Sequence, residues 1–169
     1  GCATAAEQPS TGETESSGAE TQTVSVYAAA SLKRAFGELA ERFEATHEGI
    51  TVSQVVTDGS SVLATQILEG APADVFASAD EKNMQTVADA GLAVKPELFA
   101  SNTLVVVVPT GNPGGVNALA DLASVTTVLC APEVPCGAAS NTLLANANVT
   151  LKPASLEQNV TAVLEKVAA

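Results

Sequence analysis

The chain has 169 residues, 46% of them hydrophobic but only 3% aromatic, and its 7 basic and 19 acidic residues give a formal net charge of −12. This charge excludes nucleic acid as a partner, because phosphate backbones require clustered Lys and Arg side chains. One His and three Cys are too few for an ordinary zinc site, and no apolar run reaches the about 18 residues that a membrane-spanning helix needs. We therefore expect an α/β protein whose core consists of Ala, Val and Leu.

Residues 1–22 are predicted to be a disordered tether. From Ala3 to Thr23 the sequence has no Leu, Ile, Val, Phe or Met, so nothing there can offset the entropy lost on ordering. The initial Gly1-Cys2 resembles the start of a mature bacterial lipoprotein, in which a signal peptide is removed just before a Cys that then carries lipid. The resemblance implies that Cys2 is lipidated and attaches the protein to a membrane through this anchor alone; the alternative is a free thiol.

Residues 23–100 are predicted to form a first α/β lobe. Strands are predicted at Val24–Ala28, Ile50–Val56 and Asp74–Phe76, each followed by a helix that ends at a glycine (Gly49, Gly70 and Gly91). We expect Ser31 to cap the first of these helices, and Ser78 to Glu81 to form a capping box for the third. Such alternation is typical of a parallel sheet with helices on both faces, in which ligands bind where strands lead into helices.

Residues 101–169 are predicted to form a second, partial α/β lobe. The β-branched run Leu104–Val108 predicts a buried strand, and Thr126–Cys130 predicts another. Helices are expected at Val116–Ala123, at about Gly137–Asn146 and over the last residues, where four apolar side chains share one face: Val160, Val163, Leu164 and Val167. Because two strands are too few for a stable parallel sheet, we expect either a truncated chain or a lobe that needs partners.

Cys130 and Cys136 flank a short loop that contains two prolines. A disulfide is expected for such a pair in an exported protein, with a redox couple or two unlinked thiols as alternatives. The single His, His47, is expected on the surface at the end of the first helix. Because a nucleophilic Ser or Cys needs a base and an orienting group, we expect the protein not to be an enzyme.

Ser31 and Ser60, with the neighbouring Ser61 as a weaker candidate, stand where predicted strands lead into helices. Helix N-termini offer unpaired N–H groups and a positive dipole end, so two of them at one sheet edge favour an anion. Neither loop contains Lys or Arg, and neutral donors suit a fully ionised oxyanion. Asp58 complicates this interpretation, because a carboxylate acceptor would suit a protonated anion such as phosphate.

Four segments, Val24–Leu32, Gly59–Ala64, Glu69–Asp80 and Leu104–Pro109, together resemble the molybdate-binding proteins of bacterial ABC importers. The resemblance implies a class II periplasmic-binding-protein-like fold, with two lobes that each have a mostly parallel sheet flanked by helices and a second lobe that is incomplete. It also implies that two hydroxyls and two main-chain amides hold the oxyanion, with no cofactor and no direct protein ligand to molybdenum: Ser31, Ser60, Cys136 and Val160.

The implied function is the capture of molybdate, and of tungstate too, by an extracytoplasmic monomer that is lipid-anchored or periplasmic and delivers the anion to an ABC permease. The family's last ligand is a Tyr hydroxyl in a strand beyond residue 169, and Tyr27 in the first strand cannot replace it. The alternatives are a binding protein for sulfate or another anion, a secreted hydrolase that uses Ser60 or Cys136, and a fragment that binds nothing.

Overall fold

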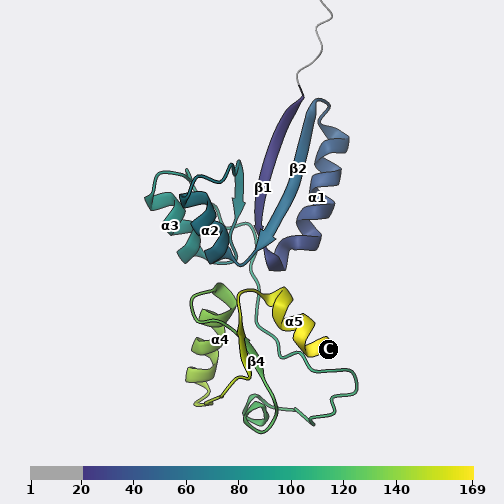
Figure 1. The fold of residues 1–169 in the computed structure, drawn as a ribbon, viewed down its shortest axis with the longest axis vertical. Coiled ribbons are helices and arrows are strands. Elements are labelled where there is room, and N and C mark those ends of the chain that lie inside the picture. The colour runs from purple at the N-terminus through teal and green to yellow at the C-terminus, as the bar shows by residue number, and fades with distance from the viewer. Residues whose placement is uncertain (1–20) are drawn as a thin grey trace, which may run out of the picture.

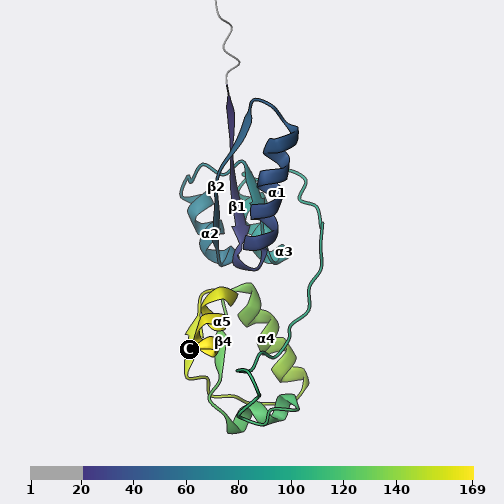
Figure 2. The same cartoon turned by 90° about the vertical axis from the view of Figure 1, so that its right-hand side faces the viewer.

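The computed structural model describes residues 21–169, which form two α/β lobes joined by a long extended segment (Figures 1 and 2). Cys2 and nearly all of the predicted tether lie outside the described residues. Among residues 21–169, no helix combines the length and the apolar character needed to cross a bilayer.

The first lobe is built on a three-stranded parallel sheet. The central strand β1 (Gln22–Ala29) pairs with β2 (Ile50–Asp58) on one side and with β3 (Val75–Ala77) on the other. Each strand leads toward a helix: α1 (Lys33–Thr46), α2 (Ser60–Leu68) and α3 (Glu81–Asp89). These elements confirm the three predicted strands and their parallel arrangement.

Alternate residues of β1 supply the cores on the two faces of this sheet. Val26 and Ala28 belong to a buried cluster that packs against Phe36 of α1, whereas Tyr27 packs against a second cluster that includes Ala64 of α2 and Val87 of α3. Figure 1 shows α1 on one side of the strands and α2 and α3 on the other. The period of two along β1 therefore gives the sheet two covered faces.

The caps of two helices differ from the prediction. Ala30–Leu32 form a 3₁₀ turn, η1, and the N-cap of α1 is Leu32, so Ser31 caps no helix. At α3 the cap is Asp80, whose Oδ1 accepts the Asn83 amide at 3.0 Å. Ser78 instead donates its hydroxyl to the Asp80 carboxylate at 3.3 Å. The predicted capping box is therefore wrong, because an Asp two residues later in the chain takes the capping role.

The second lobe contains a two-stranded parallel sheet of β4 (Val128–Cys130) and β5 (Ser155–Glu157). The 3₁₀ helix η2 (Leu119–Ser124) precedes β4, α4 (Pro135–Asn146) follows it, and α5 (Val160–Ala168) follows β5. Its core joins the loop after β4 to α5, since Ala131 and Val134 pack against Val160 and Val163. The two predicted helices α4 and α5 are confirmed, whereas β5 was not predicted.

Two carboxylates of this lobe are stabilised in the ionised form by local hydrogen bonds. Lys166 of α5 lies 2.6 Å from Glu157 of β5, and this hydrogen bond lowers the pKa of Glu157. The main-chain amides of Asn117 and Ala118 lower the pKa of Asp121 in η2. The first contact joins α5 to β5, and the second joins η2 to the two residues that precede it.

The predicted buried strand at Leu104–Val108 is wrong. These residues form no strand, and Val105 is 77% exposed. A β-branched run favours extended backbone, but a buried strand also needs neighbours on both sides, and within the described part of the chain the second lobe has only β4 and β5. The short helix predicted at Val116–Ala123 is instead the 3₁₀ helix η2.

Gly137, in the first turn of α4, has no room for a side chain, because a Cβ there would overlap the carbonyl oxygen of Ala131. We predict that Gly137→Ala lowers the free energy of unfolding by about 1–3 kcal/mol through overpacking. Gly37→Ala in α1, where the space is open, is the control and should raise it by about 0.5–1 kcal/mol. Urea denaturation followed by circular dichroism measures both; equal stabilities would contradict the packing of α4 described above.

Candidate functional site

A small cavity of about 40 Å³ lies between the two lobes. It is far smaller than the roughly 300–1,000 Å³ that is typical of sites for organic ligands, so its size suits a small ion. Seven lining residues come from the first lobe and six from the second: Ala29, Ala30, Ser31, Asp58, Gly59, Ser60 and Ala79, and Val134, Pro135, Cys136, Gln158, Asn159 and Val160.

Five strand-to-helix junctions meet at this cavity, one of which is the loop from β3 to α3 that carries Ala79. The 3₁₀ turn η1 follows β1, α2 follows β2, α4 follows β4 after a short loop, and α5 follows β5. The first amides of a helix have no partner within that helix and carry the positive end of its dipole. The cavity is therefore surrounded by main-chain donors from both lobes, which is an arrangement suited to an anion.

The structure places Ser31, Ser60, Cys136 and Val160 around this one cavity, whereas Ser61 does not line it. Ser31 is exposed and Ser60 is only 1% exposed. The Ser60 hydroxyl oxygen accepts the Ala79 amide at 2.9 Å, which leaves its single hydrogen free to donate to a ligand. Sequence reasoning missed the contribution of Ala79, because it fixes Ser60 from a different strand-to-helix loop.

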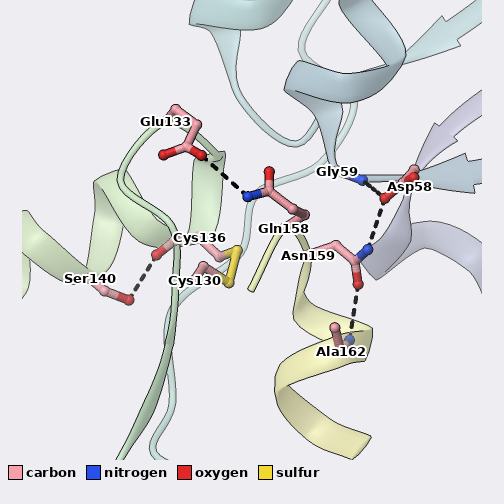
Figure 3. The surroundings of a disulfide bond; sticks show 9 residues. All are labelled: Asp58, Gly59, Cys130, Glu133, Cys136, Ser140, Gln158, Asn159 and Ala162. Atoms are coloured by element: carbon pink, nitrogen blue, oxygen red, sulfur yellow. Dashed lines mark hydrogen bonds between the residues drawn. A yellow bond between two sulfur atoms is a disulfide. The ribbon is translucent and has the colours of Figure 1, made fainter. Parts of the chain in front are cut away.

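Asp58 is the only ionisable side chain among the residues that line the cavity. Its Oδ1 accepts the Gly59 amide at 2.7 Å and the Asn159 side-chain amide at 2.8 Å (Figure 3). Two donors thus already engage the carboxylate. Asp58 was expected near the anion from the sequence, whereas no sequence pattern indicated Asn159 beside it.

Among residues 21–169, no basic side chain lines the cavity. Lys33 and Arg34 lie in an adjoining open groove of about 580 Å³ that also contains Glu38 and Glu41. Arg34 pairs with Glu38 at 3.7 Å, and both side chains are largely exposed. The donors that this cavity offers to an anion are therefore main-chain amides and hydroxyls rather than cations.

Cys130 and Cys136 form a disulfide, with their Cα atoms 5.7 Å apart (Figure 3), as predicted. The bond ties the last residue of β4 to the first turn of α4, and so fixes the segment that carries the Cys136 amide. Because the bond closes a short loop and so lowers the entropy of the unfolded chain, it raises the free energy of unfolding by about 2 kcal/mol. It also removes Cys136 as a thiolate nucleophile, which argues against a hydrolase that would use this residue.

The chain's one His does not line the cavity that contains Ser60. His47 lies at the far end of α1, about 20 Å from its first turn, and its exposed ring stacks on Phe43 with centroids 4.0 Å apart. Within residues 21–169, no group of three or more His, Cys, Asp or Glu could hold a metal ion.

Residues 24–169 match a family model described as bacterial extracellular solute-binding protein. The chain belongs to this family of solute-binding proteins. Membership of a family of solute-binding proteins agrees with the prediction that the protein is not an enzyme.

Individual solute-binding proteins resemble the chain closely. It is 46% identical over 149 residues to molybdate-binding proteins of Mycobacterium tuberculosis and Mycobacterium bovis, which covers 86% of this chain and 57% of each relative. It is 40% identical over 88 residues to the molybdate-binding protein of Escherichia coli, which covers 51% of this chain and 34% of that protein. The match thus spans little more than half the length of the mycobacterial relatives and about a third of the Escherichia coli protein.

Two solved structures share the fold. The periplasmic molybdate-binding protein of Azotobacter vinelandii matches with a TM-score of 0.53 and 21% identity, and a Clostridium difficile substrate-binding domain assigned to a molybdenum ABC transporter matches with 0.50 and 26%. Each match covers 86% of this chain and 66% of the other. These matches confirm the predicted α/β fold of the solute-binding protein.

Gly59 lets the two lobes approach, because a Cβ there would overlap the carbonyl oxygen of Gln158. Its φ of −60° is open to any residue, so Gly59→Ala should act through this contact alone. We predict that it forces the lobes apart and speeds amide hydrogen exchange at Gln158 to Val160, as measured by mass spectrometry. Gly37→Ala is the control, and wild-type protection in Gly59→Ala would contradict the contact.

Proposed function

We propose that this chain is an extracytoplasmic solute-binding protein that captures molybdate between its two lobes. The hydroxyls of Ser31 and Ser60 and the amides of Cys136 and Val160 would hold the anion, with residues 23–100 and 101–169 as the two lobes. The observation that carries the proposal is the convergence of these four donors on one small cavity that no Lys or Arg side chain lines.

The chemistry of the donors favours a fully ionised oxyanion. Such an ion has acceptor oxygens only, and each hydroxyl or amide that faces it forms a charge-assisted hydrogen bond, worth about 1.5–3 kcal/mol. Both hydrogen bonds that the Asp58 carboxylate accepts fall on its Oδ1, so the support for a dianion such as molybdate comes from the hydroxyl and amide donors and not from this carboxylate.

The names of the relatives support the same ligand. The similar proteins of the two mycobacteria and of Escherichia coli are molybdate-binding proteins. Because these proteins are longer than this chain, the affinity for molybdate has to be measured on the 169 residues themselves. Sulfate is also a tetrahedral dianion and is the competing ligand.

The proposal extends to transport. Tungstate has the same tetrahedral, doubly charged form as molybdate and should bind as well. Delivery to an ABC permease is supported by the structural match to a domain assigned to a molybdenum ABC transporter.

We also propose that the protein is a monomer that lipid on Cys2 holds at the membrane. The intact mass of the mature protein from its native membrane would show the acyl chains.

Isothermal titration calorimetry with molybdate, tungstate and sulfate tests the ligand. We predict that Ser31→Ala and Ser60→Ala each weaken molybdate binding about tenfold, since each removes one hydrogen bond to a charged group. Ser61→Ala is the matched control, because Ser61 does not line the cavity, and it should bind like the wild type.

Ser60→Ala also leaves the Ala79 amide without its partner, so its thermal unfolding midpoint should fall even without ligand. Heats for sulfate equal to those for molybdate would reject the choice of ligand. Unchanged affinity in both Ser31→Ala and Ser60→Ala would reject the site.

A further inference from the structure

One hydrogen bond joins side chains of the two lobes beside the cavity. The Nδ2 group of Asn159, the residue just before α5, donates to Oδ1 of Asp58 at the end of β2, over 2.8 Å (Figure 3). The two residues are 101 positions apart in the chain, and both are partly buried. The bond therefore closes the space between the lobes on the side of the cavity that Asp58 lines.

The same side chain has a second role that fixes its orientation. Oδ1 of Asn159 accepts the Ala162 amide at 3.0 Å and so caps α5. With the oxygen engaged by the helix, the nitrogen must face Asp58, and exchanging the two atoms would lose both hydrogen bonds. The cap thus presents a donor to the first lobe in a fixed direction.

The neighbouring residues show that the lobes fit closely at this point. Gly59, next to Asp58, has no space for a Cβ because the carbonyl oxygen of Gln158 occupies it. Gln158 in turn donates its side-chain amide to Glu133 at 3.3 Å, which links it to the loop before α4. The Asp58–Asn159 bond lies at this close approach, where a small change in distance would break it.

We propose that Asn159 is a positioning residue that latches the second lobe to the first through Asp58 and thereby slows the escape of a bound oxyanion. The effect on escape rests on the proposed oxyanion binding, whereas the latch itself does not. An amide is the side chain that fits here: it accepts from α5 and donates to a carboxylate. A carboxylate at position 159 would cap α5 equally well, but it would face the carboxylate of Asp58 and repel it.

The test is Asn159→Asp in the full chain, studied without and with molybdate. Without ligand, small-angle X-ray scattering should give a larger radius of gyration than the wild type. With labelled molybdate, rapid filtration should show release about tenfold faster and association little changed. The double variant Asp58→Asn with Asn159→Asp restores one donor and one acceptor, and should recover wild-type scattering and most of the slow release.

Two controls separate the latch from other effects. Thr142→Asp adds the same charge to the second lobe on an exposed position of α4 that lines neither the cavity nor the adjoining groove, and should keep the wild-type radius of gyration. Asp58→Ala removes the acceptor and leaves the cap of α5 intact, so it tests the latch even if Asn159→Asp fails to fold. It too should open the lobes.

The latch would be overturned if Asp58→Ala, and Asn159→Asp where it folds, both keep the wild-type radius of gyration. It would also be overturned if the lobes of the double variant, Asp58→Asn with Asn159→Asp, stay open. Failure of the wild type to bind molybdate would overturn the proposed function, while the scattering comparison would still decide the latch. Open lobes with unchanged molybdate release would overturn the role of Asn159 in retaining the anion.

Discussion

The parallel pairing of β1 with β2 is the constraint on which the site depends. Because the two strands run in the same direction, η1 and α2 begin at the same edge of the sheet. The strands β4 and β5 are parallel as well, so α4 and α5 begin together in the second lobe. These edges face each other across the cavity (Figure 1), and helix N-termini from both lobes therefore surround one point.

A site made of main-chain donors has consequences that a lysine or arginine would not give. The amides are held by folded helices, so little side-chain entropy is lost when an anion binds. Each lobe supplies only part of the donor set, and the affinity therefore depends on how closely the lobes approach. Three features act on that distance or on the donors themselves: the Cys130–Cys136 disulfide, the missing side chain at Gly59 and the Asp58–Asn159 hydrogen bond.

The sequence predicts those parts of the structure that local patterns determine. The first lobe follows from alternating strand and helix periods, and its strand-to-helix junctions already bring Ser31 and Ser60 to one edge. The run Leu104–Val108 shows the limit, because an apolar run does not reveal whether neighbouring strands exist to bury it. The polar strand β5 shows the converse, since only its pairing with β4 makes it a strand. Cys136 and Val160 required the family resemblance, and the Asp58–Asn159 contact had no local signal at all.

The central claim is that uncharged donors from both lobes hold the anion. The most direct test of this claim is the position of a bound molybdate ion. Crystals of the chain grown with molybdate, with diffraction recorded at the molybdenum absorption edge, would locate the metal in an anomalous difference map. We expect one peak in the cavity, within hydrogen-bonding range, through its oxygens, of the Ser31 and Ser60 hydroxyls and the Cys136 and Val160 amides. A peak beside Lys33 or Arg34, with none in the cavity, would contradict the account.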